Sequence, residues 1–205
     1  MDTKSHWDAI FEKKPSSQLG WFQPHLSSSL ELLSRADLPK ESSIIDVGGG
    51  DSTLVDDLLA QGHDDITVLD VSRAALARAR SRLGLRAERV RWIEGDILDT
   101  ALPERHYHLW HDRALFHFLV EEADRALYVA KLIASLAPAG RVIFATFAPD
   151  GPSQCSGLPT MRYAPADLLS LLGTGFELEA SLSEDHVMPS GAHQRFAYAM
   201  LRSSA

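Results

Sequence analysis

The sequence has one cysteine, Cys155, so it can form no intramolecular disulfide and no cysteine-cluster metal site. No apolar run approaches the length of a membrane span, and the first residues lack the apolar core of a signal peptide. We therefore expect a cytoplasmic protein without a membrane partner. Basic side chains are also few, 20 against 28 acidic ones, and the formal charge of −8 argues against a nucleic-acid partner.

A glycine loop between a buried strand and a helix dominates the remaining sequence. Residues 44–47 form the apolar run of a parallel strand, and Gly48, Gly49 and Gly50 follow it, ahead of apolar residues at helical spacing. Glycines let the backbone turn sharply and lie directly against a ligand. Asp70 ends the next apolar strand, where a carboxylate could accept both hydroxyls of a ribose. This order of features predicts a nucleoside site, although glycine turns also occur for purely structural reasons.

A third strand indicates which nucleoside would bind. Residues 90–93 are predicted to form this strand, and Asp96 and Ile97 follow it. An acid next to an aliphatic residue could hydrogen-bond an adenine amino group and pack on its ring. The alternative is that Asp96 is a turn aspartate ahead of a helix.

These segments together resemble the successive motifs of the class I S-adenosylmethionine-dependent methyltransferases. The motifs are Asp46-Val-Gly-Gly-Gly, Asp70, Gly95-Asp96-Ile97 and His111-Asp112-Arg113. The resemblance extends from about Ile44 to the C-terminus and implies S-adenosyl-L-methionine as cofactor. Ser52 stands where many members have a further glycine, which leaves the exact path of the loop open.

The resemblance also implies roles for individual residues. The cofactor-binding residues it implies are Asp46, Gly48, Gly49, Gly50, Asp70, Val71, Asp96, Ile97, His111 and Trp21. Asp112 is the candidate nearest the substrate, because it follows the fourth strand, and His111 could orient the cofactor or act as a base. A structural ion pair between Asp112 and Arg113 is the alternative. No metal site is predicted, because His108 and His111 should point to opposite faces of their strand.

Strands that alternate with helices favour an α/β parallel sheet with right-handed crossovers. The helix that begins at about Ala123 is expected to extend to Ala137 and to end at Pro138. Two alternating segments near the C-terminus suggest an antiparallel pair at a sheet edge. With the resemblance, this predicts a Rossmann-like three-layer sandwich whose seven-stranded, mostly parallel sheet has an antiparallel last strand. One domain, 1–205, is expected, with an N-terminal lid at 1–40 and the core at 41–205.

The N-terminal segment is rich in aromatic residues, and Trp7, Ile10 and Phe11 share one helical face. His6-Trp7-Asp8 and the segment around Trp21 resemble the opening of bacterial relatives of the mitochondrial citrate synthase lysine methyltransferase. Two alternatives remain: these rings cover the cofactor as a helical lid, or they pack on the outside of the sheet. Ser28 and Glu31 have the spacing of a capping box for the helix that follows.

The favoured function is methyl transfer to a small molecule or a protein side chain, with the acceptor and the oligomeric state unidentified. An NAD-dependent oxidoreductase and a non-catalytic cofactor-binding scaffold remain as alternatives. Cys155, Arg162 and Tyr163 lie in a loop near the expected pocket, where the cysteine could touch substrate or simply fill space. The arginines at 73–86 are expected to be mostly a solvated face.

Overall fold

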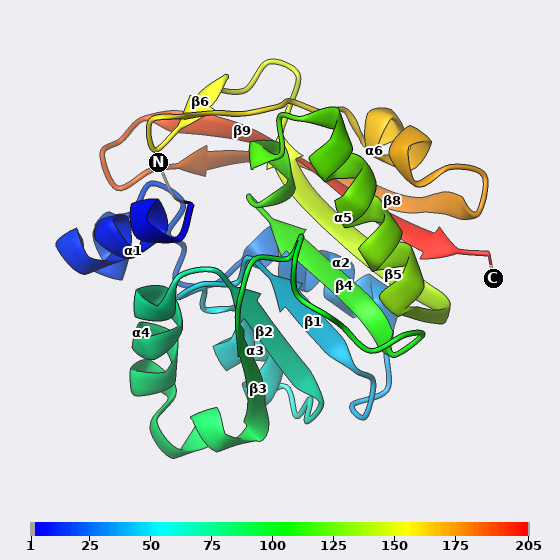
Figure 1. Cartoon of the computed structure of the whole chain (residues 1–205), viewed down its shortest axis with the longest axis horizontal. Helices are drawn as coiled ribbons and strands as arrows, with labels where there is room; N and C mark the ends of the chain where they lie inside the picture. Colours follow the sequence, from blue (N-terminus) through cyan, green and yellow to red (C-terminus); the bar gives the residue numbers. More distant parts are fainter. Residues whose placement is uncertain (1–2, 205) are drawn as a thin grey trace.

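A seven-stranded sheet runs through the middle of the computed structural model, which describes residues 3–204 (Figure 1). Its strands are β1 (Ile44–Val47), β2 (Ile66–Asp70), β3 (Val90–Glu94), β4 (Tyr107–Arg113), β5 (Leu136–Phe147), β8 (Phe176–Val187) and β9 (His193–Ser203). They lie in the order β3-β2-β1-β4-β5-β9-β8. Strands β1 to β5 pair in parallel, and β9 is antiparallel to both of its neighbours. The predicted fold class, with its antiparallel last strand, is confirmed.

The strand order reverses direction at β1. From β1 the chain builds outward through β2 to β3, then returns to place β4 on the other side of β1 and continues to β5. Every residue of β1 and β2 is buried, because helices cover both faces of these strands. In open α/β sheets of this kind, ligands bind beyond the carboxyl ends of the strands at the point of reversal.

Two layers of helices cover the sheet. The first layer contains α2 (Ser27–Ala36), α3 (Leu54–Ala60) and α4 (Arg73–Leu83), whose leucines share one apolar cluster with β1 and β2. The second contains α5 (Glu122–Ser135) and α6 (Pro165–Leu172), which share a separate cluster on the other face. Within residues 3–204, no helix has both the length and the apolar character required to cross a membrane.

Short elements connect these layers. They are the 3₁₀ helices η1 (Ser16–Gln18), η2 (Gly84–Arg89) and η3 (Phe116–Phe118) and the two-residue strands β6 (Gln154–Cys155) and β7 (Leu158–Pro159). The stretch after β5, which was expected to be a loop, thus contains a small antiparallel hairpin, β6 paired with β7.

Two local predictions were wrong. Helix α5 ends at Ser135, two residues before the predicted end, and β5 begins at Leu136, which pairs with Tyr107. A residue before proline is disfavoured in the helical region, which explains the early end ahead of Pro138. Helix α2 begins at Ser27, after an N-cap with no side-chain hydrogen bond, and so has no capping box. Ser28 instead hydrogen-bonds Glu184.

Helix α1 (Thr3–Lys13) lies outside the sheet, beside the start of α4 (Figure 1). Asp8 accepts hydrogen bonds from the Ser72 hydroxyl at 2.7 Å and the Ala74 amide at 3.1 Å. Ser72 is itself the predicted cap of α4, because its hydroxyl accepts from the Ala75 amide. These contacts hold α1 over the carboxyl end of β2.

Candidate functional site

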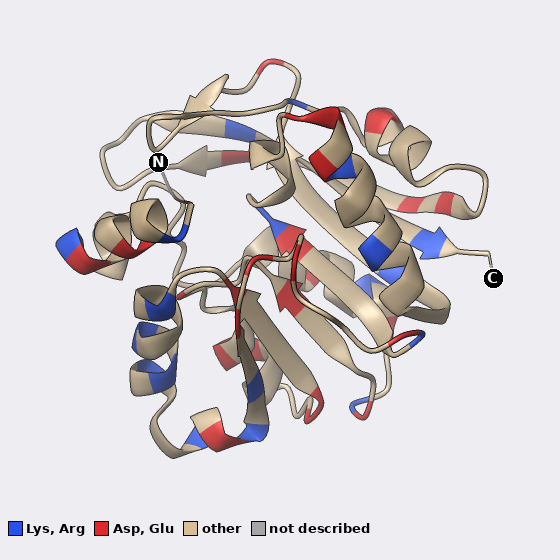
Figure 2. Ribbon diagram, in the orientation of Figure 1, with Lys and Arg blue, Asp and Glu red and all other residues tan. Residues whose placement is uncertain are grey.

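A cavity of about 460 Å³ opens at the carboxyl ends of β1, β2 and β3. Its volume falls within the range of small-molecule and cofactor sites. Gly48 lines it after β1, Asp70 and Val71 after β2, and Asp96 and Ile97 after β3. The sequence predicted all five of these residues at one site, and the fold brings them together. Figure 2 shows acidic segments gathered near the centre of the view, where several strands end.

The glycine loop takes a path that side chains would obstruct. Gly48 has φ +70°, and a Cβ there would lie 2.6 Å from the Leu115 side chain. At Gly49 a Cβ would lie 2.6 Å from an oxygen of Asp46, and Gly50 has φ +50°. Gly48 lines the cavity, whereas Gly49 and Gly50, in the loop, and Asp46, in β1, do not line it. This position agrees with Asp46 organising the loop rather than touching a ligand.

Asp70 is a buried carboxyl beside the loop. Its Oδ1 accepts a hydrogen bond from the Ser72 amide at 2.7 Å. Burial raises the pKa of Asp70 to about 7, although the Ser72 and Gly50 amides lower it, and the negative charges of Asp46 and Asp51 raise it further. A group that donates hydrogen bonds to the Asp70 carboxylate would therefore be favoured in this cavity.

Asp96 and Ile97 stand on the turn after β3. Oδ1 of Asp96 accepts a hydrogen bond from the Leu98 amide at 2.9 Å, which is the arrangement of a turn aspartate. Both residues also line the cavity, and Ile97 is 3% exposed. Asp96 therefore forms the turn and also lines the cavity, so the two interpretations of this residue are compatible.

His111 lies in the core, away from the cavity. Its Nδ1 is 2.7 Å from Oδ1 of Asp46, and its Nε2 is 2.9 Å from the Ser29 hydroxyl, with all three side chains buried. Both ring nitrogens therefore have partners within the protein. This arrangement links β4 to β1 and to α2, and it does not support contact between His111 and a bound acceptor or cofactor.

Asp112 is fully buried on the other side of β4, and its two oxygens have protein partners. Oδ1 accepts hydrogen bonds from the amides of Leu115 and Phe116, each at 3.1 Å, and Oδ2 accepts from the Tyr128 hydroxyl at 2.5 Å. Burial raises the pKa of Asp112 to about 6, although these hydrogen bonds lower it. Asp112 does not line the cavity. The structure therefore favours a positioning role over the predicted catalytic one.

The suggested ion pair between Asp112 and Arg113 is absent. Arg113 faces the opposite way, and its Nη2 lies 3.7 Å from Glu184. Arg113 also lines the cavity, together with residues 114, 115 and 117–120 from the turn after β4. Sequence reasoning missed this second wall. The available signal was the position of residues 114–120 directly after a strand that ends at the ligand edge.

Aromatic rings from the N-terminal segment form a further wall. Trp7, Phe11 and Trp21 all line the cavity. Trp7 stands edge-on to Trp21 at 5.8 Å and to Phe118 at 5.1 Å between ring centroids. The rings therefore line the cavity, and their role as a lid over a bound cofactor stays a prediction.

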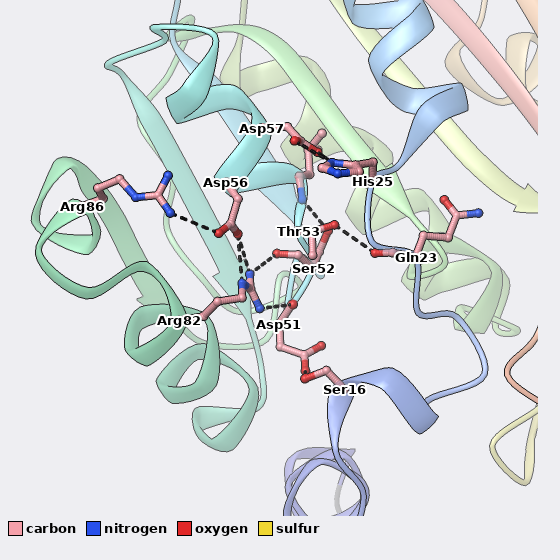
Figure 3. A network of polar contacts seen from close by, with 11 residues as sticks. Ser16, Gln23, His25, Asp51, Ser52, Thr53, Asp56, Asp57, Arg82 and Arg86 are labelled. Atoms are coloured by element: carbon pink, nitrogen blue, oxygen red, sulfur yellow. Dashed lines mark hydrogen bonds and ion pairs between the residues drawn. The ribbon is translucent and has the colours of Figure 1, made fainter.

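Polar contacts hold the far side of the glycine loop (Figure 3). Arg82 of α4 donates to the carbonyl oxygens of Asp51 and Ser52, both at 2.7 Å, and to the carboxylate of Asp56 at 2.8 Å. Ser16 of η1 donates to the Asp51 carboxylate. Arg82 is exposed, as expected for most of these arginines, but its guanidinium also fastens the loop to α4. Figure 2 shows the basic residues along this helix.

The remaining candidates contribute little chemistry. Cys155 lines the cavity, and burial raises the pKa of its thiol, which disfavours the reactive thiolate. Arg162 donates to a backbone carbonyl outside the cavity, and Tyr163 lies in the core. Within the part of the chain that the structure describes, no group of three or more His, Cys, Asp or Glu side chains could hold a metal ion.

Comparison with protein families gives a match to the model described as a methyltransferase domain, over residues 44–140. The mouse (Mus musculus) EEF1A lysine methyltransferase 2 is 22% identical over 194 residues, which cover 87% of this chain and 73% of that protein. Mouse eEF1A lysine and N-terminal methyltransferase is 22% identical over 138 residues. That alignment covers 67% of this chain but only 19% of that much longer relative.

A solved structure extends the comparison to the whole fold. It is the 1,6-didemethyltoxoflavin-N1-methyltransferase of Burkholderia thailandensis with bound 1,6-didemethyltoxoflavin and S-adenosylhomocysteine. The TM-score is 0.72 at 20% identity, and the match covers 99% of this chain and 84% of that one. At this identity the likeness establishes the common fold.

Proposed function

We infer that this chain, which belongs to the class I S-adenosylmethionine-dependent methyltransferases, transfers a methyl group from S-adenosyl-L-methionine to an acceptor bound in the same cavity. One observation carries the inference. A single cavity collects a glycine turn with positive φ and the carboxyl groups of Asp70 and Asp96 from three successive strand ends. The domain match over residues 44–140 supports the same conclusion.

The residues present fit this cofactor. We propose that Asp70 accepts hydrogen bonds from the ribose hydroxyls, because its buried carboxyl gains stabilisation from donors. Asp96 and Ile97 would hold the adenine, and Val71 and Trp21 would pack against the bound molecule. The backbone at Gly48 would contact the amino-acid portion, where a Cβ would already collide with Leu115. Gly49, Gly50 and Asp46 would act indirectly, by fixing the path of the loop.

The bound cofactor supplies a methyl group on a positively charged sulfonium. The chain's own contribution is to position the acceptor and to exclude water, because such a transfer needs little covalent help from protein groups. Asp112 and His111 have their hydrogen-bonding capacity used within the core. We therefore propose positioning roles for both, and no general base among them.

Calorimetric titration of the full chain with S-adenosylhomocysteine and, separately, with NAD tests this proposal. We expect saturable binding of S-adenosylhomocysteine at one site and none of NAD. Binding of NAD alone would refute the proposal and favour the oxidoreductase alternative. A labelled-methyl screen of lysine peptides, phenols and carboxylates then separates an enzyme from a cofactor-binding scaffold. The cytoplasmic location stays a prediction of the sequence, for cell fractionation to check.

A further inference from the structure

His117, in η3 after β4, stands in the wall of the cavity and is 0% exposed. The amide of Phe147 donates a hydrogen bond to its Nδ1 at 3.4 Å. The imidazole also stacks on the Phe147 ring, with 4.4 Å between centroids and 27° between planes. Since Nδ1 accepts a hydrogen bond, the proton of the neutral ring resides on Nε2.

The ring stays neutral under ordinary conditions. Burial, together with the positive charge of Arg113, lowers the pKa of His117 to about 3. Its Nε2 is buried and has no hydrogen-bond partner in the described part of the chain. A buried donor without a partner is costly and rare in folded proteins. His117 also lines the cavity, so a bound ligand with an accepting atom beside Nε2 would satisfy this donor.

Arg113 presents a second donor in the same wall. Its Nε donates to the Tyr198 hydroxyl at 3.1 Å, and its Nη1 to the carbonyl oxygen of Trp21 at 3.0 Å. Its Nη2 is buried without a hydrogen bond, at 3.7 Å from a Glu184 oxygen. Glu184 offsets the positive charge, so this wall offers hydrogen-bond donors rather than a strong net charge.

The surfaces around these donors are flat and apolar. The ring of Phe118 stands edge-on to that of His117, with 4.5 Å between the ring centroids, and Trp7 packs edge-on against Phe118. Phe196 lies beneath the Arg113 guanidinium, 4.9 Å from its carbon to the ring centroid. Aromatic walls of this kind bury planar apolar molecules well.

We propose that the methyl acceptor is a flat, mostly apolar small molecule with an oxygen atom that accepts a hydrogen bond from Nε2–H of His117. A carboxylate and a phenolic oxygen share this chemistry. The inference rests on the proposed function, because the acceptor would share the cavity with the cofactor. A lysine ammonium has only donors to offer and fits this wall poorly. Two of the lining carboxylates, Asp70 and Asp96, are assigned to the cofactor, and the third, Asp124, is partly exposed at the start of α5.

The first test measures binding by calorimetry on the full chain. S-adenosylhomocysteine is titrated first, and failure to bind would refute the proposed function by itself. The loaded protein is then titrated with 2-naphthoate, 2-naphthol and 2-naphthylmethylamine, which share one ring system. We expect the naphthoate or the naphthol to bind at least tenfold more tightly than the amine. Preference for the amine, or no binding of any probe at millimolar concentration, would overturn the acceptor assignment while leaving the cofactor site intact.

The second test removes the donor. His117→Phe keeps a ring against Phe147, so we expect at least a tenfold loss of affinity for the better oxygen probe and unchanged affinity for S-adenosylhomocysteine. His193→Phe, at an exposed histidine of β9, is the matched control and should change neither value. Unchanged probe affinity in His117→Phe would contradict the proposal. Nitrogen-15 spectra of histidine-labelled wild-type protein provide a test without a variant, because the Nε2 signal of His117 must shift when the oxygen probe binds.

Discussion

Asp70→Asn should stabilise the protein without ligand and at the same time weaken cofactor binding. The Asp70 carboxyl has a pKa raised from 3.8 to about 7 by burial and by neighbouring acids. At about 1.4 kcal/mol for each tenfold change in proton affinity, this difference sets an upper limit of about 4 kcal/mol on the cost of the ionised group. Asparagine has nearly the same shape, keeps an oxygen for the Ser72 amide and carries no charge.

The destabilisation caused by the ionised Asp70 carboxylate depends on pH. Below pH 3.8 the carboxyl is protonated in both the folded and the unfolded chain, so it does not lower the free energy of unfolding. Between pH 3.8 and 7 only the unfolded chain ionises, and wild-type stability therefore falls as the pH rises. Above pH 7 both states are ionised, and the cost no longer changes. The gain in Asp70→Asn should therefore increase by about 2 to 3 kcal/mol between pH 5 and pH 8.

Urea unfolding at pH 5, 6, 7 and 8, followed by circular dichroism, measures this gain. Asp99→Asn, at an exposed aspartate in the turn after β3, is the matched control and should show no such trend. Calorimetry at pH 8 should show at least tenfold weaker binding of S-adenosylhomocysteine to Asp70→Asn, because the amide accepts fewer hydrogen bonds than the carboxylate. A stability gain that is the same at every pH would refute the reasoning about ionisation, and unchanged cofactor affinity would refute the ribose assignment.

Three further predictions concern the frame of the site. Gly48→Ala should lose at least tenfold in S-adenosylhomocysteine affinity by calorimetry and about 1 to 2 kcal/mol in urea unfolding, because its φ of +70° and the adjacent leucine both oppose a Cβ. Arg82→Ala should weaken S-adenosylhomocysteine binding several-fold through the loosened loop, whereas Arg80→Ala, at an exposed arginine of the same helix, should not. Asp112→Ala should lower the free energy of unfolding by about 3 kcal/mol in urea, because it leaves buried donors such as the Tyr128 hydroxyl without partners. An Asp112→Ala protein as stable as the wild type would contradict the positioning role.

The cofactor half of the site could be predicted because its signals are local in the sequence. A buried strand, a glycine turn and a helix stand next to one another at residues 44–60, and Asp70 and Asp96 each follow a recognisable strand. In a parallel sheet the carboxyl ends of neighbouring strands meet at one edge, so sequence order alone places these residues together. The structure adds the direction in which each side chain points.

Side-chain direction is where the sequence reasoning failed. His111 and Asp112 stand at the expected strand end, but their partners, Ser29 and Tyr128, come from two different helices, α2 and α5. The residue spacing in the sequence does not show that α2 and α5 place these hydroxyl groups against the two faces of β4. The contact of Arg82 with loop carbonyls was hidden for the same reason, because a basic helix face has the same pattern whether or not it touches a loop.

The burial of Asp112 also bears on the acceptor end of the cavity. Its Oδ1 accepts hydrogen bonds from the amides of Leu115 and Phe116, and its Oδ2 accepts one from the Tyr128 hydroxyl. The turn after β4 is therefore fastened to α5. That turn carries Leu115 against Gly48 and sets His117 into the cavity wall. These hydrogen bonds indicate that the buried carboxyl of Asp112 orders the turn that lines the cavity. The residues that meet the acceptor would then be the neighbours Asp112 positions, with Asp112 itself out of reach.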